Sequence, residues 1–370
     1  MEFLTKNHVG ILFSKTIPQN FWGCLFYLGE ITMKKMRKTY TTIAALFGLA
    51  LILIGAYFYT GRADAQKQAS IPKVGILQLM SHPALDQIHQ GIDNTLKKNG
   101  YIDGKNVKIE FQNAQGDQSN LRTISKQFVQ DNVDVAVGIA TPAVQSLMNA
   151  TKTTPIILGG ITDPAGSGLV ESEKHPGKNV TGVAGQAPIK DQLKLMQTVI
   201  PNLKTLGIIY TSSDSPSATQ MKQMKDYAQQ QGITVQVSSI SSVNDLQQVG
   251  TALANKVQTI YVPTDNTVAA GMKLLSSIAA KKNIAVFPAA TTMVKDGGLA
   301  TDGISQYELG QKTGEHVVKV LQGKENPSTT PVTVVSKGHL MLNEKMAKKL
   351  NITFPDSLVK QAKKDGQIIK

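Results

Sequence analysis

The stretch GIATPAVQSLMNATKTTPIILGGITDP, residues 138–164, holds two apolar segments that each end in polar residues beside a proline. The first segment ends at Thr141 and Pro142, and the second ends at Thr162 and Asp163, directly before another proline. Continuous apolar runs separated by short helical segments are typical of parallel sheets whose two faces are both covered by helices. The stretch therefore predicts a strand, helix, strand unit of an α/β fold.

The same alternation continues through most of the chain. Amphipathic segments such as PALDQIHQGIDNTLKKNG, residues 83–100, lie between the apolar ones, and we expect Gly100 to end that helix. Its apolar face consists of Leu85, Ile88, Ile92 and Leu96. The apolar segments predict strands at residues 73–80, 107–114, 133–140, 155–161, 206–211, 234–240, 259–263, 284–289 and 298–303.

The spacing of these segments predicts two doubly wound, Rossmann-like lobes joined by a multi-strand hinge. The first lobe is expected to contain residues 71–187 and about 303–332, and the second residues 188–302 and about 333–370. We interpret the glycine-rich NVTGVAGQAP, residues 179–188, as a crossover or hinge. The pattern that follows the second set predicts a helix that returns to the first lobe, and then a last strand and helix in the second lobe.

The N-terminal part has the composition of an export segment. Residues 41–60 are uncharged and largely apolar, and basic residues precede them, which is typical of a signal peptide or an N-terminal membrane anchor. Cleavage and retention both fit, because small residues follow at 63–65 while the apolar run is long for a signal core. We interpret residues 1–40 as a leader in which Met33 or Met36 is the ordinary translation start, and residues 61–70 as a linker.

Composition and charge narrow the class of protein. The chain is 41% hydrophobic and 18% charged, enough apolar residues for a large core, and its formal net charge is +13. The lysines are scattered, which favours a solvated exterior or an anionic surface over nucleic acid as a partner. The single cysteine, Cys24, precedes the apolar run, so we expect neither a lipoprotein nor a disulfide or thiolate site in the exported part.

The polar residues at the strand ends form the candidate binding site, because ligands of parallel sheets bind beyond the carboxyl ends of the strands. Thr141 can cap a helix with its hydroxyl, and Pro142 suits the first helical position. The free amides of such a helix start can hold an anion. Similar sequences follow other strands, at Ser81, His82, Thr162 and Asp163. The alternative is that these residues only cap helices.

The second lobe offers carboxylates at its strand ends. Asp265 and Asp302 are candidates for holding a cation, although an aspartate in this position is more often a cap or a turn residue. Carboxylates opposite hydroxyls and free amides would suit a zwitterion. Arg122 is the only arginine after residue 65, which favours helix N-termini over an arginine clamp as the carboxylate holder. This lobe also offers Thr211, Ser212, Ser213 and Asp214 after its first strand, and Asn266 beside Asp265.

Catalytic and metal-binding patterns are missing from the sequence. There is no HExxH, no Walker A loop and no GxSxG elbow, and the histidines after the leader show no metal-like spacing. We therefore expect neither an enzyme nor a cofactor. An enzyme that uses Asp265 and Asp302 as a carboxylate pair is kept as an alternative.

Several ordered motifs together resemble one family, the substrate-binding proteins of ABC transporters of the tryptophan/tyrosine type, and in particular its tryptophan-binding branch in lactic and streptococcal bacteria. The resemblance extends from Pro72 to the C-terminus. The motifs are SHPALD (81–86), NAQGD (113–117), IATPAVQ (139–145), TDPAGSGLV (162–170), PGKNVTGV (176–183), YVPTDNTV (261–268) and YELG (307–310).

This resemblance implies a type I periplasmic-binding-protein fold that closes on an extracellular amino acid, most of all L-tryptophan, and delivers it to a permease and its ATPase. It implies that Thr141 and Thr162 hold the α-carboxylate and that Asp265 or Asp302 holds the α-ammonium. Further lining residues would be Ser81, His82, Pro142, Asp163, Gln186, Ser212, Ser213, Asn266 and Tyr307. We expect a monomer at the extracellular face of the membrane, attached through residues 41–60 or secreted after cleavage.

The residues themselves leave the ligand open. The only tryptophan, Trp22, lies in the leader, so an aromatic ligand would have to stack on other side chains. Candidates near strand ends are Tyr210, Tyr261, Phe287 and Tyr307, although most residues of this kind belong to a core. The alternatives are a binding protein for another amino acid, or an exported sensory module of the same fold.

Overall fold

The computed structural model describes residues 48–54 and 71–370. Residues 48–54 are helical, and Ile71–Lys370 forms one compact unit. Within these described parts no helix is both long and apolar enough to cross a membrane. The predicted leader, most of the predicted signal or anchor segment and the predicted linker lie outside the described residues.

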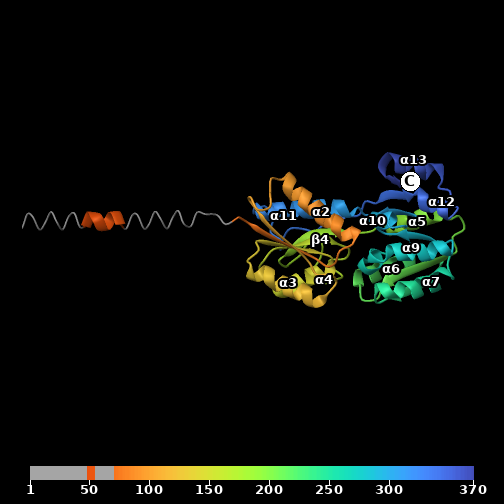
Figure 1. The fold of residues 1–370 in the computed structure, drawn as a ribbon, viewed down its shortest axis with the longest axis horizontal. Coiled ribbons are helices and arrows are strands. Elements are labelled where there is room, and N and C mark those ends of the chain that lie inside the picture. The colour runs from red at the N-terminus through yellow and green to blue at the C-terminus, as the bar shows by residue number, and fades with distance from the viewer. Residues whose placement is uncertain (1–47, 55–70) are drawn as a thin grey trace, which may run out of the picture. The chain divides into compact units, whose positions relative to one another are not determined.

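The first lobe of the 71–370 unit is built on a parallel sheet of order β11-β5-β4-β3-β1-β2. Helices α2 and α11 cover one face of this sheet, and α3 and α4 cover the other (Figure 1). The strands are β1 (Lys73–Gln78), β2 (Lys108–Asn113), β3 (Val135–Ile139), β4 (Ile156–Ile161), β5 (Val180–Gly185) and β11 (Thr333–Val335). The helices are α2 (Pro83–Lys98), α3 (Gln118–Gln130), α4 (Thr141–Ala150) and α11 (Gln306–Leu321).

The second lobe contains a parallel sheet of order β7-β6-β8-β9 and a smaller mixed sheet of order β10-β12-β13. The strands are β6 (Thr205–Thr211), β7 (Thr234–Ile240), β8 (Thr259–Val262), β9 (Ala285–Pro288), β10 (Ala300–Gly303), β12 (His339–Asn343) and β13 (Gln367–Ile369). The helices are α5 (Ile189–Val199), α6 (Ser215–Gln230), α7 (Leu246–Ala254), α8 (Asn266–Ala270), α9 (Met272–Lys281), α10 (Thr291–Lys295), α12 (Glu344–Lys349) and α13 (Asp356–Asp365), with a 3-10 turn at Val243–Asp245 before α7. Each lobe buries its own apolar core.

Every apolar segment that the sequence predicts as a strand is one, which confirms the doubly wound α/β prediction. The structure also contains strands that the sequence did not predict, among them β5 and β13. Val180–Gly185, which we had interpreted as a hinge, forms β5 and is buried along its whole length between β4 and β11. Its glycines hide it from a β-propensity pattern, yet Gly182 is needed there because a Cβ would overlap the backbone of Leu158. The crossing to the second lobe comes only after Gly185.

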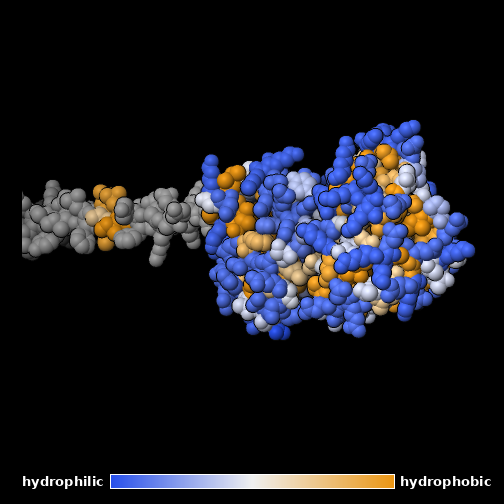
Figure 2. Space-filling view, turned by 45° about the vertical axis from the view of Figure 1, so that its right-hand side comes forward, coloured by the Kyte–Doolittle hydropathy of each residue, from blue (hydrophilic) through white to orange (hydrophobic). Residues whose placement is uncertain are grey.

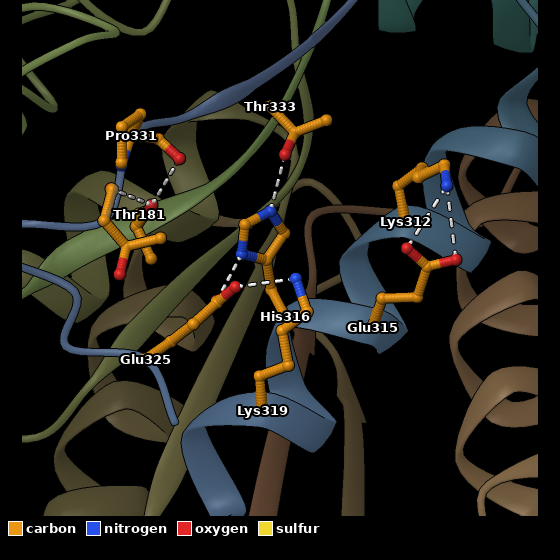
Figure 3. Close-up of polar contacts among 9 residues, drawn as sticks. Thr181, Lys312, Glu315, His316, Lys319, Glu325, Pro331 and Thr333 are labelled. Carbon is orange, nitrogen blue, oxygen red and sulfur yellow. Dashed lines mark hydrogen bonds and ion pairs between the residues drawn. The ribbon is translucent and has the colours of Figure 1, made fainter. Parts of the chain in front are cut away.

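The C-terminal part of the chain serves both lobes. Helix α11 returns to the first lobe, as predicted, and packs against α2. The strand that follows, β11, was expected in the second lobe but pairs with β5 of the first. Figure 3 shows how this segment is fastened: the buried His316 of α11 contacts Glu325 through Nδ1 at 2.7 Å and Thr333 through Nε2 at 2.9 Å. The Thr181 hydroxyl of β5 also donates to the carbonyl of Thr330.

Hydrophilic residues cover most of the face of this unit that Figure 2 shows. The exposed large apolar side chains of the unit are spread over both lobes, at Ile71, Ile102, Phe111, Val237, Leu274 and Val334. Single exposed apolar side chains are normal on soluble proteins. They therefore do not mark a particular function.

The packing of α2 against α11 is unusually close. The predicted apolar face of α2 is buried, and where the helices meet, Gly91 and Gly310 allow the two backbones to touch. A Cβ at Gly310 would overlap the carbonyl oxygen of Ile88, and a Cβ at Gly91 would overlap that of Tyr307. This contact fixes the first turns of α2, which begins at the carboxyl edge of the sheet.

Replacement of Gly310 tests this contact. We expect Gly310→Ala to lower the free energy of unfolding by about 1–3 kcal/mol, because the added methyl group meets backbone that has to move. The matched control is Gly250→Ala in α7, where a Cβ meets side-chain atoms alone, the nearest being Cδ1 of Leu275 at 3.1 Å. The control should be neutral or stabilising, since alanine is the better helix former. Urea unfolding measures both, and equal stabilities for the two variants would contradict the interpretation.

Candidate functional site

A cleft of about 430 Å³ lies between the two lobes at the carboxyl ends of their parallel strands. Its size is typical of small-molecule sites. The first lobe contributes the segments after β1, β3 and β4, and the second contributes those after β6 and β8. Of the residues predicted from the sequence, the cleft is lined by His82, Thr141, Pro142, Thr162, Ser213, Asp265 and Asn266.

Thr141 stands at the start of α4, but it does not cap the helix as predicted. The N-cap residue is Ala140, which has a φ of +77°, and no side chain caps this helix. A positive φ is rare for alanine and costs free energy, so it marks a backbone held in place by its surroundings. Because Thr141 is the first helical residue instead of the cap, its hydroxyl has no acceptor or donor within residues 71–370. Helix N-termini also carry partial positive charge.

The other two hydroxyl-and-proline sequences differ from the prediction as well. A turn, and no helix, follows Thr162, and the Asp163 carboxylate accepts a hydrogen bond from the backbone N–H of Gly166 at 2.9 Å. Thr162 lines the cleft, whereas Asp163 does not. Ser81 likewise lies outside the cleft lining, because its hydroxyl donates to the Asp86 carboxylate at 2.9 Å.

His82 is the N-cap residue of α2, and its ring reaches the second lobe. The Nε2 atom lies 3.2 Å from Oδ1 of Asn266, the first residue of α8. The side chain is 5% exposed, and Nδ1 has no hydrogen-bond partner in the described residues. Burial lowers the pKa of His82, although the hydrogen bond to Asn266 and nearby carboxylates oppose this. The imidazole is therefore neutral at pH 7.

Asp265 is buried in the second lobe's wall. Its carboxylate accepts hydrogen bonds from the backbone N–H of Thr211 at 2.6 Å, from the Thr211 hydroxyl at 2.7 Å and from the N–H of Val268 at 2.9 Å. These bonds connect the end of β6 to the start of α8. Asp265 is thus a cap, as the plainer interpretation held, and it also carries a negative charge into the cleft lining.

Asp214 belongs to the cleft, although the sequence favoured Asp265 and Asp302 over it. It lines the cleft and caps α6, with its carboxylate accepting from the N–H of Ser217 at 3.2 Å. Burial, and then repulsion by Asp265, raise the pKa of Asp214 to about 7. The sequence signal was only a turn, Ser-Ser-Asp, after a strand. The proximity of Asp265, which follows a different strand, could not be read from it.

Four further predicted residues lie outside the cleft lining, in addition to Ser81 and Asp163: Gln186, Ser212, Asp302 and Tyr307. Gln186 and Ser212 are exposed, and the Ser212 hydroxyl donates to the carbonyl of Ile240. Asp302 lies in β10 opposite Leu340 of β12, where burial raises the pKa of its carboxyl.

The four aromatic residues considered for stacking do not line the cleft. Tyr307 accepts a hydrogen bond from Asn94 at 3.0 Å and lines a separate hollow beside β12. Tyr261 is fully buried and donates to Gln192, Phe287 belongs to the same core, and Tyr210 lies outside the lining. The apolar wall consists instead of aliphatic and sulfur-containing side chains, including Leu79, Met80, Leu85, Ile88, Ile161 and Met293. Such side chains pack well on flat rings, and thioethers adapt to them.

The arrangement is suited to binding. The second lobe lines the cleft with the carboxylates of Asp214 and Asp265, and the first lobe with the start of α4 and most of the apolar side chains. Within the residues that the structure describes, no group of three His, Cys, Asp or Glu side chains is placed to hold a metal ion. A cation that neutralises the Asp214 and Asp265 charges would be favoured.

A model of the family described as ABC transporter substrate binding protein matches residues 73–365 of the chain. The chain belongs to this family. The fold is accordingly that of the type I periplasmic binding proteins, which the sequence predicted, and solute-binding proteins of low identity share this fold with the chain.

Similar proteins carry more specific names. The chain is 37% identical to the tyrosine-binding protein of Clostridioides difficile strain R20291. The alignment spans 291 residues, which are 79% of this chain and 83% of the relative. The chain is 44% identical to an ABC domain from Streptococcus pneumoniae that was solved in complex with L-Trp. This structural match has a TM-score of 0.77 and covers 81% of this chain and 100% of that one. A ligand-free, open substrate-binding protein with adhesive properties from Clostridium difficile is 37% identical, covers 81% of this chain and 99% of that one, and has a TM-score of 0.65.

The raised pKa of Asp214 predicts a pH dependence of stability without ligand. Between its ordinary pKa of 3.8 and about 7, the folded protein holds a proton that the unfolded chain releases, so stability falls as pH rises through this window. Asp214→Asn should remove this slope and be more stable at pH 8 by roughly 1–4 kcal/mol. Asp226→Asn, on the exposed part of the same helix, should leave the slope unchanged. Urea unfolding of the wild type and both variants at pH 5 and pH 8 measures the effect. A wild-type stability that does not fall relative to Asp214→Asn between these two pH values would contradict the raised pKa.

Proposed function

We propose that this substrate-binding protein captures an aromatic amino acid, L-tryptophan in the first place, in the cleft between its lobes and delivers it to an ABC permease and its ATPase. The observation that carries the proposal is the pairing of Asp214 with Asp265 on one wall of the cleft. Two carboxylates that repel each other in a desolvated site call for a cation. The α-ammonium of an amino acid is such a cation.

The ammonium lies against Asp214 in this proposal, and Asp265 is a supporting charge. Asp265 already accepts three hydrogen bonds from Thr211 and Val268, so it has little remaining capacity. Asp214 has more, since its carboxylate receives only backbone N–H groups. Asp302 drops out of this role because it lies outside the cleft lining.

The α-carboxylate lies against the opposite wall. The Thr141 hydroxyl is free of protein partners within the 71–370 unit, and it stands with the first amides of α4 at the strand end. Thr162 lines the cleft one strand away. A hydroxyl and helix amides hold a carboxylate without an arginine.

The ring lies in the apolar part of the cleft. Leu85 and Ile88 project from the first turns of α2, and Met293 lies on α10, which packs against α2. The relatives support a ring as ligand, since one is named for tyrosine and another was solved with L-Trp. Closure of the two lobes would remove this surface from water.

The lobes are close together in this structure, as His82 and Asn266 touch across the cleft. The higher TM-score with the L-Trp complex than with the open, ligand-free protein agrees with this. In the proposed cycle a monomer at the extracellular face closes on the ligand and opens at the permease. Attachment to the membrane through residues 41–60 belongs to the same proposal.

Titration of the isolated 71–370 unit with L-tryptophan tests the function. This unit is compact, and its S. pneumoniae counterpart was solved as a chain that it covers completely. Since Trp22 lies outside the unit, all indole emission comes from the ligand. We expect saturable binding with a blue-shifted ligand emission, and calorimetry gives the values for L-tyrosine and L-phenylalanine. Absence of binding to all three would remove the proposal.

Substitution of Asp214 tests the ammonium site. Asp214→Asn should weaken L-tryptophan binding by about 10- to 100-fold, because a charged hydrogen bond is lost. In the wild type, protons compete with the ammonium, so affinity should fall as pH drops below about 7, and the variant should lack this dependence. Ser212→Ala, outside the cleft lining, is the control and should bind like the wild type. If affinity did not change in Asp214→Asn, the ammonium would have to bind elsewhere.

A further inference from the structure

His82 has a hydrogen-bonding group that no residue of the described parts of the chain uses. Its side chain lines the cleft and is 5% exposed, and Nδ1 is buried without a partner in the described residues. Buried polar atoms are nearly always paired, and an unpaired one in a binding cleft calls for an explanation. It also lowers stability relative to a paired atom.

The neighbouring contact fixes which kind of partner Nδ1 needs. Nε2 lies 3.2 Å from Oδ1 of Asn266, which can only accept, so Nε2 carries the proton. Burial keeps the ring neutral by lowering its pKa, against the opposing effects of Asp86, Asp265 and Asp296. Nδ1 of a neutral ring protonated at Nε2 is an acceptor. The missing partner is therefore a donor.

Building on the proposed function, we propose that Nδ1 of His82 accepts a hydrogen bond from the N–H or O–H group on the ligand's ring. His82 would thus select aromatic amino acids that carry a ring donor, such as an indole or a phenol, over those with a purely hydrocarbon ring. A site built to bond a donor rejects analogues that lack it, because its own polar atom is then left unpaired.

The α-ammonium is the competing donor for this atom, because Asn266 contacts His82 through its side chain and Asp214 through its backbone N–H. The residues beside His82 on its own helix favour the ring donor instead. His82 belongs to the α2 side of the cleft, next to Leu85 and Ile88 on the same helix. Helix α10, which carries Met293, packs against α2 there. This is the apolar part of the cleft, where the ring lies.

The same residue connects the ligand to closure. His82 comes from the first lobe and Asn266 from the second, so their contact forms only when the lobes are together. Closure without ligand buries Nδ1 unpaired, and closure on a ring donor satisfies it. The ligand's ring thus contributes to closing the cleft.

A pair of isosteric ligands tests the inference on the 71–370 unit. L-tryptophan is compared with 3-(3-benzothienyl)-L-alanine, in which sulfur replaces the indole N–H at nearly the same size. Competition calorimetry should show that the wild type prefers L-tryptophan by about 10- to 100-fold. This comparison needs no variant, so it does not depend on whether a substituted protein folds. Equal affinities would overturn the inference while leaving the proposed function intact.

Variants assign the preference to His82. His82→Phe keeps a flat ring without the acceptor and should reduce the preference to within about threefold. Asn266→Leu removes the contact across the cleft but leaves Nδ1, so it should weaken both ligands and retain the preference. His89→Phe on the same helix, where the ring stacks on Phe111 away from the cleft, is the matched control and should match the wild type.

The outcomes separate the two proposals. A preference that disappears in His82→Phe and persists in Asn266→Leu supports the inference. A preference that persists in His82→Phe overturns it and assigns the ring donor to another acceptor. If the unit binds neither ligand, the proposed function fails, and the inference fails with it.

Discussion

The contact between α2 and α11 is the constraint on which the site depends. At Gly91 and Gly310 the two helices approach until backbone touches backbone, which only residues without a Cβ allow. Helix α11 comes from the far end of the chain, after the second lobe is nearly complete. Helix α11 thus fixes α2 over the sheet. Because α11 directly follows the chain's return from the second lobe, the same contact links that crossing to the helix whose N-cap residue is His82. A shift of this contact would move one wall of the site and the hinge together.

The sequence predicted the elements well because each depends on local patterns. The β-branched runs became strands, and the face of α2 from Leu85 to Leu96 is buried as its spacing requires. The failures arose where tertiary packing overrides local preference. The glycines of Val180–Gly185 suggest a crossover or hinge, yet the segment is a buried strand between β4 and β11, and Gly182 is required there because Leu158 leaves no room for a side chain. The brief β11 pairs with β5 for reasons that lie in His316 and Thr181, far away in the sequence.

The site was predictable as a place but less so as a set of residues. Strand ends were the right place to look, since that rule follows from parallel topology alone. Thr141, His82 and Asp265 line the cleft as predicted. The Thr141 hydroxyl, however, does not cap α4, and no side chain caps α2. Asp214 was not favoured from the sequence because the raised pKa of its carboxyl depends on Asp265, which lies near it only in the folded chain. Asp302, which was favoured by its position at a strand end, lies in β10, which pairs with β12, and is outside the cleft lining.

Two groups in the cleft are unsatisfied in the same sense. Asp214 is a carboxylate held near another carboxylate, and His82 presents a lone pair to a dry interior. Each makes the closed, empty cleft less stable than it would be with matching ligand groups. An open and a closed state in exchange differ in how many of these groups they bury, and a ligand shifts the balance only by what it contributes to the closed state. A zwitterion with a ring donor would meet both needs at once, whereas an ion alone or a hydrocarbon ring alone would meet one or neither. The groups that destabilise the empty cleft are thus the same groups that make closure depend on the ligand's chemistry.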